Sequence, residues 1–265
     1  MPVSPLLFWT LVALLVLFAA GFVGVGNYAL RQRVRMKLRP NFSKPPIPHV
    51  ALGAWNEIFR SNGLGPDRAS EIRFIGQAGS LSTISDTETW VLGALAKGAR
   101  RIFEFGTATG RTTYVLACNA PDDAKIDTLT FRASESDTYE MTEDDPDAEK
   151  WRSIAIGESN YEHFYYEDTP VADKVTQHFG DSAKFDIAPF EGKVDLIFVD
   201  GAHAYTYVKG DSARALRMVA PGGHVLWHDY SPRCPGVFKA LNELGRELPL
   251  AHLKGTTLVA YRKPG

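Results

Sequence analysis

Apolar residues form one long run near the N-terminus and a series of short runs farther along the chain. Leu6–Leu30 is an uncharged stretch of 25 residues. As a helix it would extend roughly 37 Å, which is enough to cross a hydrocarbon layer about 30 Å thick. The pattern therefore predicts one transmembrane helix.

Short apolar runs predict buried strands over Arg101–Phe105, Ile126–Phe131, Val175–Phe179, Val194–Val199, His224–Trp227 and Thr257–Arg262. Amphipathic segments predict helices over Asp86–Lys97, Arg111–Asn119, Tyr205–Val219 and Gly236–Glu247. Asp86 or Thr87 can cap the first of these helices. Strands that alternate with helices in this way predict an α/β domain with a doubly wound, mainly parallel sheet.

A basic segment after the apolar run predicts the orientation of the transmembrane helix. Residues 31–39 read RQRVRMKLR, with five basic residues and no acid. Because basic flanks stay on the cytoplasmic side, we expect a single-pass membrane protein whose C-terminal domain is cytoplasmic. A cleaved signal peptide and a buried soluble helix are the alternatives, and the basic segment and the length of the run oppose them.

Prolines separate this segment from the rest of the chain. Pro40, Pro45, Pro46 and Pro48 predict a stiff linker. We therefore expect a transmembrane anchor with a basic cytoplasmic flank over 1–39, a linker over 40–50 and a folded domain over 51–265. The formal net charge is −2, and the five basic residues of the anchor leave −7 for the remainder. Such an acidic body is a poor partner for nucleic acid.

The folded domain contains an insertion at about 132–170, which is too long for a plain crossover between strands. Residues 133–149 hold eight acids and no base. Residues 151–166 then supply an aromatic group, namely Trp151, Tyr161, Phe164, Tyr165 and Tyr166. Two interpretations stay open, a solvated acidic loop and a lid over a ligand crevice.

The turn after the first predicted strand carries the first candidate binding residues. It reads EFGTATG over 104–110 and leads into a helix. Glycines allow a tight turn and a close approach of a ligand to the backbone. The spacing G-x-x-x-G differs from both the P-loop and the G-x-G-x-x-G of nicotinamide dehydrogenases. Glu104 disfavours a pyrophosphate and favours a ligand with an ammonium group.

EFGTATG resembles the first motif of the class I methyltransferases that use S-adenosylmethionine. Four segments occur in the order found in a metal-assisted O-methyltransferase-like branch of that family: ETWVLGALAKGARRIFEFGTATGRTT, GDS at 180–182, VDLIFVDGAHAYTYVKGD and PGGHVLWHDY. The resemblance covers about residues 70–262. It implies a Rossmann-like, doubly wound, mainly parallel seven-stranded sheet and S-adenosylmethionine as cofactor.

The resemblance also implies roles for individual residues in binding this cofactor. The loop backbone would surround the methionine part, Glu104 would lie near its ammonium group, and a pair after the third strand would contact adenine. The loop residues are Gly106, Thr107 and Gly110, and the pair is Asp181 and Ser182.

Thr130 stands where the family usually has an acid that accepts both ribose hydroxyls. A threonine can hold one hydroxyl but cannot accept two hydrogen bonds as a carboxylate does. Glu135 or Asp137 can substitute for that acid, unless they belong to the acidic loop.

A second group of candidate residues ends two neighbouring predicted strands. Asp200 follows VDLIFV, and His228 and Asp229 follow HVLW. A carboxylate at a buried strand end is costly unless it is paired, hydrogen-bonded or metal-bound. The resemblance implies that these three residues hold a divalent ion, Mg²⁺ or Mn²⁺, and imidazole favours Mn, Fe, Ni or Zn. A hydrogen-bonded polar edge without metal is the alternative.

His203, three residues after Asp200, is the candidate catalytic base, and Asp200 is the second candidate catalytic residue. The resemblance implies this role, because catechol-type relatives have a proton-accepting lysine at that offset. An imidazole with a reference pKa of about 6.5 can accept a proton at neutral pH. Capping the helix that begins near Tyr205 is the alternative role.

These residues together predict a membrane-anchored methyltransferase that acts on a hydroxyl of a small or lipid-linked molecule. The expected partners are this acceptor, the membrane through one N-terminal helix, and a second copy of the chain in a homodimer, but no nucleic acid. A catalytically silent methyltransferase-like scaffold at the membrane is the alternative from another class. The missing third glycine disfavours a nicotinamide oxidoreductase.

Overall fold

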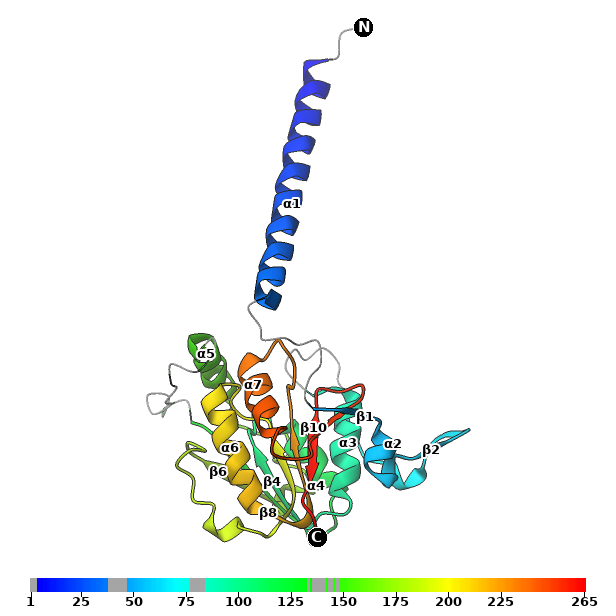
Figure 1. Cartoon of the computed structure of the whole chain (residues 1–265). Coiled ribbons are helices and arrows are strands. Elements are labelled where there is room, and N and C mark those ends of the chain that lie inside the picture. Colours follow the sequence, from blue (N-terminus) through cyan, green and yellow to red (C-terminus); the bar gives the residue numbers. More distant parts are fainter. Residues whose placement is uncertain are drawn as a thin grey trace. The chain divides into compact units, whose positions relative to one another are not determined.

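The computed structural model describes residues 4–37, 47–76, 84–132, 134, 142, 145 and 148–265. It divides into two compact units, Met1–Pro45 and Pro46–Gly265. The first unit contains one long helix, α1 (Pro5–Lys37) (Figure 1). Within it, Trp9–Ala29 spans 21 residues with a mean hydropathy of 2.2, and none of that span is buried. By length and composition this helix can cross a membrane, although a signal sequence has the same properties.

The second unit is built on an eight-stranded sheet with the order β1-β9-β10-β8-β7-β4-β5-β6. Its parallel part consists of β8 (Val219–Trp227), β7 (Val194–Val199), β4 (Arg101–Phe105), β5 (Lys125–Thr130) and β6 (Val175–Phe179). Two antiparallel pairings follow, between β8 and β10 (Val259–Arg262) and between β10 and β9 (Ala251–Leu253). The predicted Rossmann-like, mainly parallel α/β fold is confirmed.

The strand count of seven is wrong by one, because the described residues include the two-residue strand β1 (His49–Val50). It pairs in parallel with β9, with His49 opposite His252 and Val50 opposite Leu253. His49 and Val50, which fall within the linker expected over 40–50, thus pair with the sheet. Pro48 is compatible with this strand because β1 lies at the edge of the sheet, where one side needs no partner.

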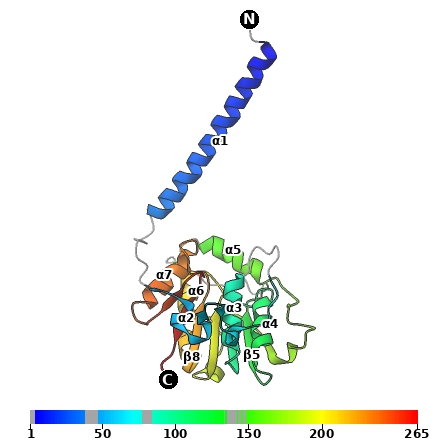
Figure 2. The same cartoon turned by 90° about the vertical axis from the view of Figure 1, so that its right-hand side faces the viewer.

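Helices cover the sheet in two pairs. One pair is α3 (Asp86–Ala96) with α4 (Arg111–Asn119), and the other is α6 (Tyr205–Met218) with α7 (Pro235–Leu244). The strands run between these pairs (Figures 1 and 2). The shorter elements are α2 (Leu52–Trp55), η1 (Glu57–Phe59), β2 (Ser61–Asn62), β3 (Gly65–Pro66), η2 (Arg68–Ser70), α5 (Ala148–Glu158), η4 (Ala172–Lys174) and η5 (Ala188–Phe190).

The start of α3 differs from the sequence prediction. Ser85 is the N-cap, and its side chain accepts from the backbone N–H of Glu88 while the Glu88 side chain accepts from the backbone N–H of Ser85. Asp86 and Thr87, the predicted caps, are the first two helical residues. This reciprocal capping box satisfies two N–H groups that the helix leaves free at its start.

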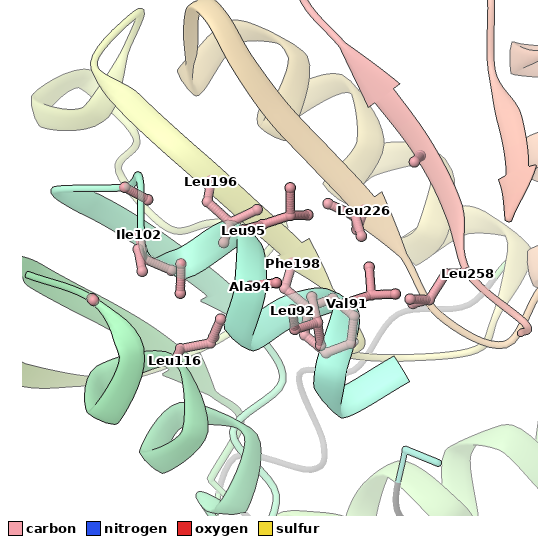
Figure 3. Packing of buried hydrophobic residues seen from close by; sticks show 14 of the residues in the cluster. Val91, Leu92, Ala94, Leu95, Ile102, Leu116, Leu196, Phe198, Leu226 and Leu258 are labelled. Atoms are coloured by element: carbon pink, nitrogen blue, oxygen red, sulfur yellow. The ribbon is translucent and has the colours of Figure 1, made fainter. Parts of the chain in front are cut away.

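The core fixes α3 on the sheet. Val91, Leu92 and Leu95 pack against side chains from β7 and β8, including Leu196, Phe198 and Leu226 (Figure 3). Burying an aliphatic or aromatic side chain of this size contributes roughly 1.5–3 kcal/mol. Since β4, β5, β7 and β8 run parallel, their carboxyl ends meet at one edge of the sheet, and the first turn of α3 is held in a defined place relative to this edge.

Candidate functional site

The turn after β4 lies directly against the end of β7. Gly106 has φ of +97°, and a Cβ at this position would lie 2.1 Å from the backbone oxygen of Asp200. The backbone N–H of Asp200 donates to the carbonyl of Phe105 over 2.9 Å. Only glycine fits this position, because both its backbone angle and the space beside it exclude a side chain.

Glu104 lies fully buried behind this turn. Its Oε2 accepts hydrogen bonds from the hydroxyls of Thr113 at 2.5 Å and Thr128 at 2.7 Å. Its Oε1 is buried and has no hydrogen-bond partner among the described residues. Burial raises the pKa of Glu104 to about 8, although the two hydroxyl bonds act in the opposite direction. When Glu104 is ionised, Oε1 is therefore an acceptor that the described residues do not satisfy.

A hollow of about 570 Å³, partly open to solvent, adjoins the turn. Three of the predicted cofactor residues, Gly106, Thr130 and Ser182, line it. Thr107 does not line it, and its hydroxyl instead lies 2.8 Å from that of Thr128 and accepts from the Gln177 amide. Some of the predicted cofactor residues therefore line the first hollow, whereas Thr107 bonds to neighbouring side chains instead.

Gly110 and Asp181 also lie outside the lining of this hollow. Gly110 has φ of +75° and packs under Phe164 and Tyr166, which a Cβ would approach to 2.9 and 3.0 Å. Asp181 stabilises its own turn, because its Oδ1 accepts from the backbone N–H of Ala183 over 2.9 Å.

Asp211 is a lining residue that the sequence analysis missed. Only 2% of it is exposed, and its Oδ1 has no hydrogen-bond partner among the described residues. Burial raises the pKa of Asp211 to about 7, and a hydrogen bond with Ser182 opposes this rise. An acid on the sheet-facing side of the amphipathic helix α6 was the signal available in the sequence.

A second, smaller hollow of about 240 Å³ contains the strand-end residues. Asp200, His203 and His228 line it, and it shares Gly201 and Ala202 with the first hollow. The first hollow, where we expect the cofactor, and the second hollow, which contains the acids and histidines, are therefore neighbours at Gly201–Ala202.

Asp200, His228 and Asp229 come together as the strand ends predicted, with ligand atoms within 4.8 Å of one another. Nδ1 of His228 lies 3.1 Å from Oδ1 of Asp200 and 3.5 Å from Oδ2 of Asp229. The other ring nitrogen, Nε2, lies 3.4 Å from Oε2 of Glu88. Glu88 was not predicted as a site residue, although the capping pattern S-x-x-E marks it in the sequence.

His203 joins the same cluster through Asp229, whose Oδ2 lies 2.6 Å from Nε2 of His203. Burial lowers the pKa of His203, but the charges of Asp229, Asp200 and Glu158 outweigh this effect and raise it. For Asp229, burial raises the pKa, and hydrogen bonds from His203 and His228 lower it well below its usual range. The capping role considered for His203 is wrong, since Ala204 is the N-cap of α6.

The described part of the insertion packs over this region. Trp151 of α5 is buried, and its ring stacks on His203 with centroids 4.8 Å apart and an interplanar angle of 22°. Asp145 accepts from the backbone N–H and the hydroxyl of Thr206, each over 2.7 Å, at the start of α6. These contacts favour the lid interpretation over the solvated loop. Glu135 and Asp137 lie outside the described residues.

Residues 103–230 match a protein-family model described as a methyltransferase domain. This stretch of the chain is similar to a methyltransferase domain. This confirms the resemblance to the class I methyltransferases inferred from the sequence motifs. A comparison with curated proteins finds no match.

Solved structures similar to this chain include two O-methyltransferases. One is TomG from Streptomyces achromogenes, in complex with SAM, with 21% identity, a TM-score of 0.44 and coverage of 68% of this chain and 82% of that chain. The other, from Bacillus cereus in complex with SAH, has 20% identity, a TM-score of 0.44 and coverage of 69% and 84%. The SAH-bound Podospora anserina methyltransferase PaMTH1 has 18% identity, a TM-score of 0.46 and coverage of 69% and 80%.

Two buried acceptors of the matched region fit S-adenosylmethionine. Oε1 of Glu104 and Oδ1 of Asp211 are both without a partner among the described residues. The cofactor carries two matching donors, the ammonium of its methionine part and the amino group of its adenine.

The strand-end residues of the matched region also fit a divalent ion. Asp200 and Asp229 offer carboxylate oxygens, and His228 offers a ring nitrogen whose partner nitrogen faces a carboxylate. A histidine that ligates a metal commonly donates its other N–H to such a group.

Proposed function

We propose that the protein is a membrane-anchored S-adenosylmethionine-dependent O-methyltransferase that acts on a hydroxyl of a small or lipid-linked molecule. The observation that carries this proposal is the buried Oε1 of Glu104 behind the Gly106 bend, which has no partner in the part of the chain that the structure describes. This acceptor suits an ammonium group, and the Gly106 bend lies against the backbone of Asp200, which lines the second hollow with His203. A methyl donor and a hydroxyl acceptor can therefore meet at the shared segment Gly201–Ala202.

When bound, S-adenosylmethionine supplies an electrophilic methyl group, and a divalent ion supplies positive charge that favours ionisation of the acceptor hydroxyl. The chain itself orients these groups. Glu104 would bind the ammonium group, Thr130 a ribose hydroxyl, and Ser182 with Asp211 the adenine. Asp200, His228 and Asp229 would hold the ion.

His203 would take the proton from the hydroxyl of the methyl acceptor. The Asp229 carboxylate forms a hydrogen bond with Nε2 of His203. When the ring is neutral, Nδ1 is therefore the nitrogen that can accept a proton. Stacking on Trp151 fixes the ring plane and excludes water from one face. Because the pKa of His203 is raised above the ordinary imidazole value, the neutral form that can accept a proton becomes more populated as pH rises, so the rate should rise with pH.

Calorimetry with S-adenosylmethionine on the full-length protein in detergent tests the cofactor part. We expect saturable binding that Glu104→Gln weakens at least about tenfold, as the loss of a charge-assisted hydrogen bond of 1.5–3 kcal/mol implies. Binding that is absent in the native protein would contradict the proposal.

Release of S-adenosylhomocysteine with a panel of phenolic and lipid-linked hydroxyl compounds tests the reaction. Asp200→Asn should abolish turnover while cofactor affinity changes by less than about threefold, because Asp200 would act on the acceptor side. Equal turnover in this variant would argue against that role.

A catalytically silent scaffold at the membrane is the second candidate, and Thr130 supports it, because its hydroxyl replaces the carboxylate usual at the ribose. Cofactor binding without turnover of any acceptor would favour this candidate.

The membrane part of the proposal is a single-pass topology with the methyltransferase domain in the cytoplasm. It is supported by the apolar span of α1 and by the basic residues that follow this span in the sequence. A homodimer is the oligomeric state we propose to test by light scattering.

A further inference from the structure

Glu88 is held far more firmly than a helix cap requires. It is 4% exposed, and it lies in the first turn of α3. Oε2 accepts from the backbone N–H and the hydroxyl of Ser85, over 2.8 and 2.7 Å. Oε1 accepts from the backbone N–H and the hydroxyl of Thr257, over 2.6 and 2.8 Å. Four donors, two from the neighbouring N-cap residue Ser85 and two from the distant Thr257, thus fix one buried carboxylate.

This fixed carboxylate faces one side of the His228 ring. Oε2 of Glu88 lies 3.4 Å from Nε2, while Nδ1 faces Asp200 and Asp229 on the other side. Because four groups donate to Glu88, its carboxylate acts only as a hydrogen-bond acceptor. It therefore favours a proton on Nε2 of His228.

We propose that Glu88 is a positioning residue that fixes His228 as a nitrogen ligand through Nδ1, and that the site formed with Asp200 and Asp229 selects a first-row transition ion over Mg²⁺. This inference rests on the proposed function only in that both use the same strand ends. It assigns Glu88 a role that its place in the helix cap does not reveal.

The ligand set is the reason for the selectivity. Mg²⁺ prefers a shell of oxygen atoms, and it exchanges water for nitrogen reluctantly. Imidazole suits Mn²⁺, Fe²⁺, Co²⁺ and Zn²⁺ better, and among these the affinity of a mixed site generally rises toward the later metals. Two carboxylates with one imidazole therefore favour Mn²⁺ or a later ion.

A metal-free arrangement of the same residues makes a different prediction. With protons on both nitrogens, His228 would be an imidazolium cation balanced by Glu88, Asp200 and Asp229. The ring would then have no lone pair for a metal. The two arrangements differ in the proton on Nδ1, and this difference can be measured.

The first experiment measures metal binding to the full-length protein in detergent after removal of metals with a chelator. Mn²⁺ binding is followed by the electron paramagnetic resonance signal of free Mn²⁺, and Mg²⁺ is titrated as a competitor. We expect Mn²⁺ to bind at least tenfold more tightly than Mg²⁺, and Glu88→Gln to weaken Mn²⁺ by about 10–100-fold, the range typical for such supporting residues.

Glu88→Gln keeps the size of the side chain, but an amide cannot accept on both sides, so one set of partners loses its acceptor. Asp86→Asn is the matched control, because it removes an exposed acid from the same helical turn. It should leave Mn²⁺ affinity unchanged within twofold. Native protein that binds no Mn²⁺, or Glu88→Gln protein that binds it as the native protein does, would overturn the proposal.

A second measurement needs no variant and covers the case in which Glu88→Gln does not fold. Nitrogen NMR of ¹⁵N-histidine-labelled native protein, with His228→Gln used only to assign its resonance, reports the proton on each ring nitrogen. With Zn²⁺ added, Nδ1 of His228 should shift while Nε2 stays protonated. If both ring nitrogens of His228 are protonated and their resonances do not change when Zn²⁺ is added, the proposal is wrong. Calorimetry with S-adenosylmethionine in the same samples separates this outcome from failure of the proposed function.

Discussion

Several residues of the candidate site have roles that follow from their immediate neighbours. Gly106 leaves no room for a Cβ beside the carbonyl of Asp200, and Glu88 joins a helix cap to His228. Among the described residues, Glu104 has hydrogen-bond partners on one oxygen only. In each case the chemistry depends on a contact between segments far apart in the sequence. Single substitutions at these positions are therefore informative about the whole site.

Gly106→Ala is expected to destabilise the domain strongly. A positive φ costs a non-glycine residue about 1–3 kcal/mol, and the added methyl would also displace the Asp200 carbonyl that lies 2.1 Å from its position. Urea unfolding should show a loss above about 2 kcal/mol.

Gly157→Ala is the matched control for this substitution, because nothing lies within 4 Å of a Cβ there. In helix α5 it should stabilise by about 0.5–1 kcal/mol. Equal stability of the Gly106 variant and the native protein would contradict the geometry of the bend.

Glu104 predicts how stability depends on pH. Its pKa is about 8 in the folded protein and near the ordinary glutamate value when unfolded, so the folded state binds more protons between these values. The free energy of unfolding should therefore fall as pH rises from about 5 to about 8. Urea unfolding of the native protein and of Glu104→Gln, compared across this range, measures the effect. A difference between the two that does not change with pH would refute it.

At the residue level the sequence revealed the types of groups in the site but not all of their partners. Asp200, His228 and Asp229 could be placed together because parallel strands end at a common edge. Glu88 and Asp211 could not, because their contacts depend on how α3 and α6 pack on the sheet. The caps of α3 were misjudged by one residue for a similar reason, since neighbouring polar residues compete for that position.

At the level of elements, strongly periodic segments were predictable. The bounds predicted for β4, β6, β7 and α4 agree with the structure, and β8 begins earlier than expected, at Val219. A two-residue strand such as β1 is too short to show an alternation of apolar and polar residues, so this edge strand could not be predicted. The insertion was recognised by its length, but its packing over His203 required coordinates.

The contact between α5 and His203 yields a prediction about this insertion. Trp151→Ala should remove the stacking partner of His203 and loosen α5, because Trp151 is the buried residue of that helix. Hydrogen exchange at residues 148–158 should accelerate at least tenfold, and turnover should fall more than cofactor affinity. Glu149→Gln, at the exposed side of the same helix, is the control. Unchanged exchange in Trp151→Ala would show that the stacking does not hold α5.

For the whole molecule, the prediction concerns association with membranes. The apolar span of α1 is long enough to cross a bilayer, so the native protein should stay with membranes through an alkaline carbonate wash. Deletion of residues 1–39 should release the remaining chain into the soluble fraction. Complete extraction of the native protein by carbonate would exclude a spanning anchor.

The contact at Gly106 has a consequence for any attempt to re-engineer this protein. Because no side chain separates the bend from the end of β7, a shift of one backbone is transmitted to the other. Exchanging the loop for that of another family member, without the matching strand, should disturb donor and acceptor pockets together. Grafts designed to change the substrate while keeping the cofactor should therefore take both segments from a single parent.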